Sequence, residues 1–181
     1  MLFRSDQHEA VDQVAVHGAN RTGRPFTGDY AGILLYDTLH RAGFASRPES
    51  THAADGLELL DCRITNAVKC LPPANRPLPD EVRRCNGYLA TEIGSLPEGA
   101  AVLALGLIAH AAVLMALDLK RSAHRFAHGA RHALPGGRAL YDSYHCSRYN
   151  TQTRRLTPRM FRKVVDAIRA ELRPGQPRRS R

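Results

Sequence analysis

The sequence has none of the features that mark an exported or membrane-spanning protein. Its first residues, MLFRSDQHEAVDQ, carry charges where a signal peptide needs an apolar core. The longest apolar run, AAVLALGLIAHAAVLMAL, is interrupted by Gly106 and His110, and fits a strand, a turn and a helix better than a membrane span. We therefore expect a cytoplasmic protein, in a compartment where thiols stay reduced.

Acidic residues are in short supply. The chain has 17 Asp and Glu against 26 Lys and Arg, which gives a net charge of +9 with His neutral and a pI near 9.9. A globular chain this basic indicates a polyanionic partner, nucleic acid before an anionic membrane. Solubility alone is the alternative explanation of the charge. Apolar residues make up 43% of the 181 residues, which indicates one folded domain rather than a disordered chain.

Cysteines are also few. The stretch AVKCLPPANRPLPDEVRRC contains Cys70 and Cys85, which are too far apart for a zinc knuckle and too few for an iron–sulfur cluster. In a reducing compartment, cysteines indicate metal or cluster ligands before disulfides. Buried or surface thiols without a metal are the alternative, which fits Cys62 better than Cys70.

Apolar patterns predict strands that alternate with helices. The expected strands are 57–68, 100–106 and 138–145, and the expected helices are 79–96, 107–119 and 157–172. Another helix is expected to begin at Thr27 or Asp29 and to end at Gly43. Its apolar face would be Ile33, Leu34, Tyr36 and Leu39, and that of the last helix Phe161, Val164, Val165, Ile168 and Leu172. This alternation predicts a three-layer α/β/α sandwich with a central, mostly parallel sheet.

Polar side chains gather in the three loops where such a sheet binds ligands, beyond the carboxyl ends of its strands. The loops are 17–29, 65–79 and 145–157, and their candidates are Asn20, Arg21, Arg24, Phe26 and Asp29; Asn66 and Asn75; and His145, Ser147, Arg148, Asn150, Arg154 and Arg155. Amides read base edges, rings stack on bases and arginines hold phosphates. Asp29 is placed to orient a water and His145 to donate to a carbonyl that gains negative charge.

Each candidate also has a purely structural interpretation. Asp29 fits a helix cap, and Asn66 and Asn75 fit turns. Phe26 fits a core position, and His145 fits a buried polar group whose hydrogen bonds are satisfied.

At these loops the sequence resembles a known family. The stretches HGANRTGRPFTGD, ITNAVKCLPPANRP and SYHCSRYNTQTRRLT look like the three motif regions of the iron–sulfur-containing uracil-DNA glycosylases. HGANRTGR is typical of family 5 (type 5) rather than family 4, and the likeness runs from about residue 15 to about residue 170. It implies an enzyme that hydrolyses the N-glycosidic bond of uracil, and of other deaminated bases, in DNA, which initiates base excision repair.

The resemblance also implies roles for residues. Asp29 matches the acidic residue that positions or activates water, and His145 matches the histidine that stabilises the leaving base. The remaining matches are Asn75 and Asn150 in catalysis or base contact, Phe26, Asn66, Asn20 and Ser147 at the base, and Arg21, Arg24, Arg148, Arg154 and Arg155 at the DNA backbone.

The same resemblance implies a [4Fe–4S] cluster held by four cysteines. Cys70 and Cys85 match one pair of ligands. Cys62 and Cys146 do not look like substitutes for the other pair, so we expect the missing ligands to lie before Met1. We expect the family's first strand to be missing or altered within an altered segment 1–16, followed by the glycosylase domain at 17–172 and a basic disordered tail at 173–181.

Two motif positions depart from the family. Cys146 replaces a proline, and Arg154 replaces a glycine in a turn that needs a positive φ. These departures leave a second hypothesis open, a truncated, catalytically impaired remnant that binds DNA without excision. An unrelated nucleotide-binding α/β protein is a third. Nothing in the sequence demands more than a monomer.

Overall fold

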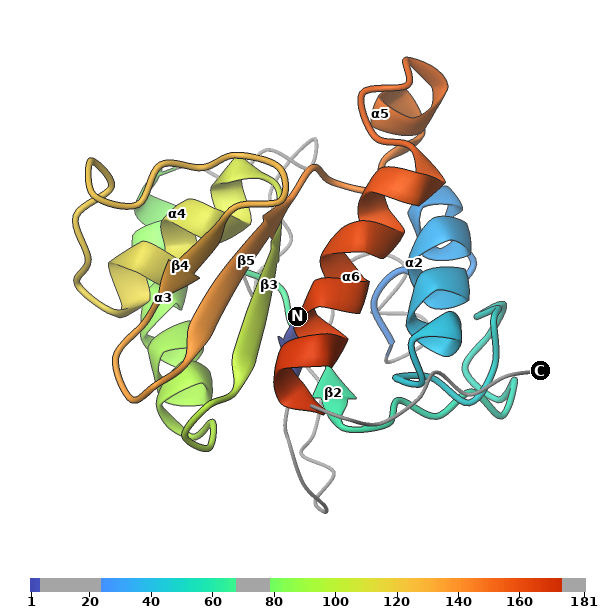
Figure 1. Ribbon diagram of the computed structural model, residues 1–181, viewed down its shortest axis with the longest axis horizontal. Helices are drawn as coiled ribbons and strands as arrows, with labels where there is room; N and C mark the ends of the chain where they lie inside the picture. The colour runs from blue at the N-terminus through green and yellow to red at the C-terminus, as the bar shows by residue number, and fades with distance from the viewer. Residues whose placement is uncertain (4–23, 68–78, 174–181) are drawn as a thin grey trace.

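One five-stranded sheet runs through the computed structural model, which describes residues 1–3, 24–67 and 79–173 (Figure 1). The strands are β1 (Leu2–Phe3), β2 (Cys62–Arg63), β3 (Ala101–Leu105), β4 (Arg131–Ala133) and β5 (Ala139–Ser143). The helices are α2 (Tyr30–Arg41), α3 (Pro79–Gly94), α4 (Leu107–Ala116), α5 (Arg148–Gln152) and α6 (Pro158–Leu172). Along the sheet the strand order is β2-β1-β3-β5-β4.

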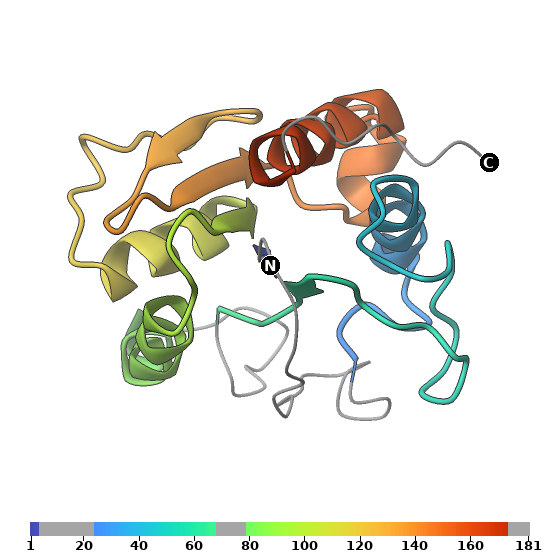
Figure 2. The same ribbon diagram turned by 60° about the horizontal axis from the view of Figure 1, so that its bottom comes forward.

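Helices cover both faces of the sheet, which confirms the predicted three layers (Figures 1 and 2). Alternate residues of β3 and β5 point to opposite faces, as the period of a strand requires. Leu103 and Tyr141 pack with α2 and α6 in one apolar cluster. Val102 and Leu140 pack with α3 and α4 in the other cluster.

The prediction of a mostly parallel sheet is wrong for the described strands. Only β3 and β5 pair in parallel, in a register that runs from Ala101–Ala139 to Leu105–Ser143. The short β1 lies between β2 and β3 and is antiparallel to both. β4 was not predicted; it forms a hairpin with β5 through a turn in which Gly136 and Gly137 have φ of 72° and 66°. The loop between the two strands, residues 134–138, is closed by a hydrogen bond from the amide of Leu134 to the carbonyl of Arg138 at 2.8 Å, and its glycines adopt the positive φ values that a short hairpin loop needs.

Helix α2 begins and ends where the sequence predicts. The Asp29 carboxylate accepts a hydrogen bond from the amide of Ala31, so Asp29 is the helix cap, and Gly43 follows the end of the helix with φ of 77°. Tyr36 and Leu39 are buried as expected. Ile33 is not buried, because it is 67% exposed.

Helix α6 also matches its prediction. Its five apolar residues, Phe161, Val164, Val165, Ile168 and Leu172, are all buried. The hydroxyl of Thr157 accepts from the amide of Met160, and Pro158 stands in the first turn, where its missing N–H costs nothing.

Two other segments differ from the prediction. The expected strand 57–68 shortens to β2 and one isolated bridge between Ala45 and Leu59. Within the expected loop 145–157, residues 148–152 form the short helix α5. None of the described helices combines the length and the apolar character needed to cross a bilayer.

Candidate functional site

The loops after β3 and β5 meet at one edge of the sheet. The amide of Gly106, which follows β3, donates to the carbonyl of Ser143 at 2.8 Å. A Cβ at Gly106 would lie 3.7 Å from the Cβ of His145, and the φ of 98° at Gly106 favours glycine. The turn into α4 therefore passes directly beside His145. This edge lies at the top of Figure 1, beneath α5.

The loop before α2 brings Phe26 to the same place. The rings of Phe26 and His145 have centroids 5.8 Å apart and are tilted by 50°. The loop can pack this closely on α2 because residue 32 is a glycine: a Cβ there would meet the carbonyl oxygen of Phe26 at 2.0 Å. The hydroxyl of Tyr36 in α2 donates to the carbonyl of Pro25 at 2.6 Å and so holds the loop against the helix. Phe26 itself has a φ of 64°, a conformation that non-glycine residues rarely adopt.

Burial controls the charge of His145. Desolvation lowers the pKa of its imidazole from the ordinary value of 6.5, and the nearby charge of Asp29 acts in the opposite direction without cancelling the shift. The ring is therefore neutral at pH 7, which leaves it one N–H to donate and one lone pair to accept. Asp29 itself is exposed, so the carboxylate that caps α2 remains accessible to water.

Two of the predicted site residues support the backbone at His145. The side-chain amide of Asn150 donates to the carbonyl of His145 at 2.9 Å. The hydroxyl of Ser147 accepts from the amide of Asn150 at 3.3 Å and caps α5. Asn150 and Ser147 thus hold the turn that carries His145 through their own hydrogen bonds.

Exposed arginines surround α5. The guanidinium of Arg148 lies 5.5 Å from the centre of the Tyr30 ring, and that of Arg155 lies 4.7 Å from the centre of the Tyr144 ring. Such cation–π contacts hold the side chains while their charged groups stay accessible. Arg154 is also exposed and has a φ of 58°, which confirms the expectation that its turn needs a left-handed residue.

Arg24 is engaged in a different way. Its guanidinium donates to Asp55 at 2.8 Å, to the hydroxyl of Ser50 at 2.7 Å and to the carbonyl of Leu57 at 3.2 Å. Burial acts to raise the pKa of Asp55, but hydrogen bonds from the Leu57 amide, Arg24 and the Thr51 amide outweigh it and hold that pKa well below its usual range. Arg24 therefore joins the loop before α2 to the loop 50–57, and we leave it out of the surface proposed for DNA.

Of the remaining predicted site residues, the structure describes Asn66 but not the others. Asn66 is half-buried beyond β2, and its neighbour Thr65 donates to Glu92 of α3 at 2.8 Å. Asn20, Arg21, Asn75 and Cys70 lie outside the described residues.

Two of the described cysteines do not fit an iron–sulfur cluster. The thiol of Cys62 donates to the carbonyl of Phe44 at 3.3 Å, and burial raises its pKa to about 12. Burial likewise raises the pKa of Cys146 to about 12 in the core beneath α6. A cluster binds thiolates, so both thiols are poor ligands. Cys85, buried on α3, remains the described member of the predicted pair with Cys70.

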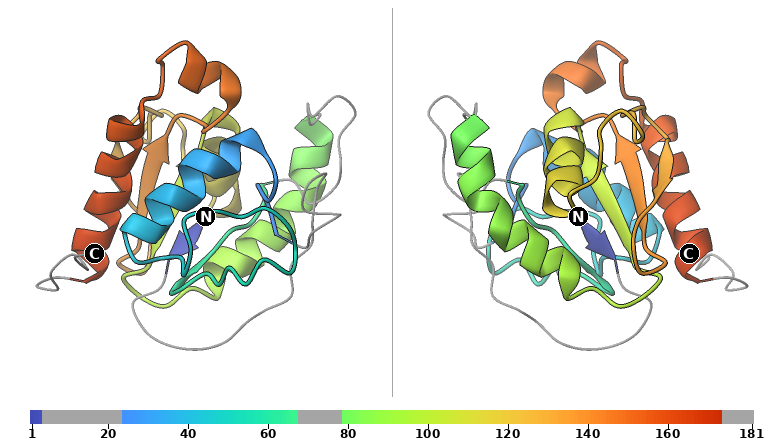
Figure 3. Two further views of the ribbon diagram at one scale, coloured as in Figure 1. Left: turned by 90° about the vertical axis from the view of Figure 1, so that its right-hand side faces the viewer. Right: turned by 90° about the vertical axis from the view of Figure 1, so that its left-hand side faces the viewer.

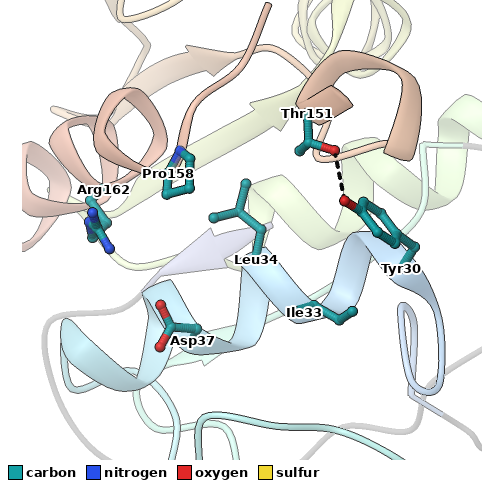
Figure 4. A pocket seen from close by; sticks show the side chains of 7 residues that line it. All are labelled: Tyr30, Ile33, Leu34, Asp37, Thr151, Pro158 and Arg162. Atoms are coloured by element: carbon teal, nitrogen blue, oxygen red, sulfur yellow. Dashed lines mark hydrogen bonds between the residues drawn. The ribbon is translucent and has the colours of Figure 1, made fainter. Parts of the chain in front are cut away.

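A separate pocket opens between α2, α5 and α6, as Figure 4 shows. Its volume is about 350 Å³, and the hydroxyl of Thr151 donates to that of Tyr30 at its rim. The lining residues are Tyr30, Ile33, Leu34, Asp37, Thr151, Pro158 and Arg162. None of them is a residue that the sequence predicts for the site, so this pocket is distinct from the contact between Phe26 and His145.

Sequence reasoning missed a polar cluster on the other face of β5. Asp142 is fully buried, and its carboxylate contacts His110 of α4 and His132 of β4. The signal was present: in the expected strand, period-two alternation puts Asp142 on the same face as the core residue Leu140. A charged residue on a buried face calls for partners.

Comparisons with known proteins identify the family of the chain. A model of the uracil DNA glycosylase superfamily matches residues 15–169. The chain is 53% identical over 149 residues to a type-5 uracil-DNA glycosylase of Thermus thermophilus, covering 82% of this chain and 68% of that protein. Proteins of the same name match from Pyrobaculum aerophilum, at 41% over 157 residues (87% and 68%), and from Mycobacterium bovis, at 45% over 149 residues (81% and 56%). The chain thus spans between 56% and 68% of the length of these relatives.

Proposed function

Because the chain belongs to the type-5 branch of the uracil DNA glycosylase superfamily, we propose that it hydrolyses the N-glycosidic bond of uracil in DNA and so initiates base excision repair. The observation that carries the proposal is the convergence of Phe26 and His145, with the charge of Asp29 acting on the imidazole. A base turned out of the duplex needs such a combination: a ring to stack on, a donor for its carbonyl and a carboxylate near the sugar.

In this mechanism each residue acts at a different atom. As the bond from C1′ to the base breaks, negative charge grows on the base carbonyl and positive charge grows on the sugar. The neutral imidazole of His145 donates its N–H to the carbonyl and stabilises the departing anion. The carboxylate of Asp29 orients the attacking water and stabilises the positive sugar. Phe26 stacks on the base and keeps bulk water away from its face.

Asn150 and Ser147 act through His145. The hydrogen bond from the side-chain amide of Asn150 to the carbonyl of His145 fixes the turn after β5, and Ser147 caps the helix that carries Asn150. We therefore propose Asn150 and Ser147 as positioning residues. Asn66, Asn20 and Asn75 remain proposals for base contact. The exposed Arg148, Arg154 and Arg155, together with Arg21, are proposed to bind DNA phosphates, in a protein that we expect to be a cytoplasmic monomer.

We propose two ligands for an iron–sulfur cluster. Cys70 and Cys85 would be two of the ligands of a [4Fe–4S] group, whereas Cys62 and Cys146 do not fit as the others. We derive no step of the reaction through this group. The alternative of a DNA-binding remnant without excision is less well supported, because the relatives that match most of the chain carry the glycosylase name.

A single substitution tests the proposal cleanly. Asn caps a helix about as well as Asp, so Asp29→Asn removes the charge but keeps the cap of α2. We expect uracil release from an oligonucleotide, measured by alkaline strand cleavage, to fall about 10²- to 10⁴-fold. Asp37→Asn, further along the same helix and paired with Arg41, is the matched control and should excise normally. Excision by wild type that Asp29→Asn leaves unchanged contradicts the assigned role, and no excision by wild type contradicts the function.

A further inference from the structure

The buried cluster on the α4 face of β5 contains two imidazoles and one carboxylate at close range. The Nδ1 atom of His110 lies 2.8 Å from one oxygen of Asp142, and the Nε2 atom of His132 lies 3.1 Å from the other. The side chains of His110, Asp142 and His132 are 3%, 0% and 13% exposed. One ligand atom from each of the three residues can be chosen so that all three atoms lie within 4.8 Å of one another.

The hydrogen bonds of His110 define the chemistry of this cluster. Its Nε2 atom lies 2.8 Å from the carbonyl oxygen of His124, which can only accept, so Nε2 carries the hydrogen. In a neutral ring Nδ1 then presents a lone pair, which faces the carboxylate of Asp142 at 2.8 Å. Two lone pairs cannot face each other at that distance without a cation between them. The cation is a proton or a metal ion.

A third candidate ligand lies beside this pair. The Nε2 atom of His132 faces the other oxygen of the same carboxylate at 3.1 Å, where it either donates its own N–H or, as the other tautomer, offers a lone pair to a metal ion shared with His110 and Asp142. From metal–ligand bonds of about 2.0–2.2 Å, tetrahedral zinc ligands lie roughly 3.3 Å apart. The separations of 2.8 Å and 3.1 Å, each to a different oxygen of Asp142, would need to widen by a few tenths of an ångström, and the longest separation in the group, up to 4.8 Å, would need to shorten.

The surroundings of the cluster are those of a metal site. Metal-bound histidines usually donate their other N–H to a carbonyl or carboxylate, as His110 does to His124. The ring of Phe126 meets that of His110 edge-on, with centroids 5.6 Å apart, and shields the site from water. Two imidazoles and one carboxylate suit zinc better than magnesium or calcium, which prefer oxygen ligands.

We propose that His110, His132 and Asp142 bind a divalent zinc-type ion, with the fourth position left to a water molecule. The ion joins α4, β4 and β5, which contribute one ligand each. Its place is structural: Asp142 precedes His145 by three residues along the chain but faces the opposite side of the sheet. This site is independent of the proposed excision chemistry and of the cysteines.

Metal content tests the site. The full chain, saturated with zinc and then dialysed against a weak chelator, should retain one zinc per chain by mass spectrometry of the metal. His132→Gln keeps a side-chain amide that can donate to Asp142, and should weaken zinc binding by more than the loss of about 10- to 100-fold that is typical of changes outside the ligand set. His52→Gln, at an exposed loop position, is the control and should bind zinc as wild type does.

Zinc held by cysteines must be distinguished from zinc held here. The double variant Cys70→Ser/Cys85→Ser should retain its one zinc, and loss of that zinc would overturn the proposal. Equal zinc affinity in wild type and His132→Gln would also overturn it and leave a proton between His110 and Asp142.

As a measurement that needs no variant, cobalt(II) added to wild type should give the intense visible bands of tetrahedral coordination. The weak spectrum of hexa-aquo cobalt would contradict the site.

Discussion

The two faces of β5 carry two polar sites of different construction. On the face toward α2 and α6, His145 meets Phe26 through loops, and the charges nearby, on Asp29 and the arginines of α5, stay accessible. On the face toward α4, His110 and His132 meet Asp142 from regular elements, and all three are largely buried. Figure 3 shows how α2 and α4 lie on opposite sides of the sheet. The first arrangement leaves its charged groups accessible from solvent, whereas the polar groups of the second contact one another inside the protein.

If the first site depends on loop contacts, loosening the loop that carries Phe26 from the neighbouring loop 50–57 should have the largest effect on stability. Arg24 and Asp55 have side chains only 12% and 6% exposed. Asp55→Ala leaves the guanidinium without its carboxylate partner, and we expect a loss of about 3–5 kcal/mol in the free energy of unfolding, measured with urea. Asp37→Ala breaks the exposed pair with Arg41 and should cost little. Equal losses in the two variants would show that the loop pair is not special.

A glycine substitution tests how closely the first site is packed. Gly32→Ala brings a Cβ to 2.0 Å from the Phe26 carbonyl, so the loop must move away from α2. We expect a cost of about 1–3 kcal/mol and a weaker contact between Phe26 and His145. Gly87→Ala is the matched control in α3, because nothing lies within 4 Å of its added Cβ, and it should stabilise by about 0.5–1 kcal/mol. Thermal unfolding of both variants measures the contrast, and the same sign for both would refute it.

The two faces differ in how far the sequence predicts them. Motif positions predicted the first site because Phe26, Asp29 and His145 lie in long recognisable stretches, and strand periodicity put their loops at one edge. The second site was not predicted from the sequence. Strand β4 is only three residues long and joins β5 through a glycine turn, so the sequence assigned His132 to no strand. The same short pairings made the sheet mixed rather than mostly parallel. Local patterns locate long elements well, whereas pairing of two- and three-residue strands depends on tertiary contacts.

DNA binding should depend on the arginines of the first site alone. Arg148→Ala removes an exposed guanidinium beside α5, and we expect the slope of log affinity against log salt to fall by about 1. Arg41→Ala, at the far end of α2, should leave the slope unchanged. Fluorescence anisotropy at a series of salt concentrations provides the measurement. An unchanged slope in Arg148→Ala would remove this residue from the DNA surface.

Acid should affect the first site through His145. Burial lowers its pKa below 6.5, so the unfolded chain binds more protons than the folded chain between the folded pKa and 6.5. The free energy of unfolding should therefore decrease as the pH falls below about 6.5. Excision should persist below that pH, because the imidazole stays neutral there. An acid limb of the rate profile above pH 6.5 would mean that another group controls the reaction.

The most direct test of the account compares one substitution in each of the two polar sites. Single-turnover uracil release should be measured for wild type, His145→Ala and His132→Gln under the same conditions. The account predicts a fall of about 10²- to 10⁴-fold in His145→Ala, because the donor to the leaving base is lost. It predicts a much smaller change in His132→Gln, because that residue lies on the structural face. Equal losses in both variants, or none in His145→Ala, would contradict the division of β5 into a reactive and a structural side.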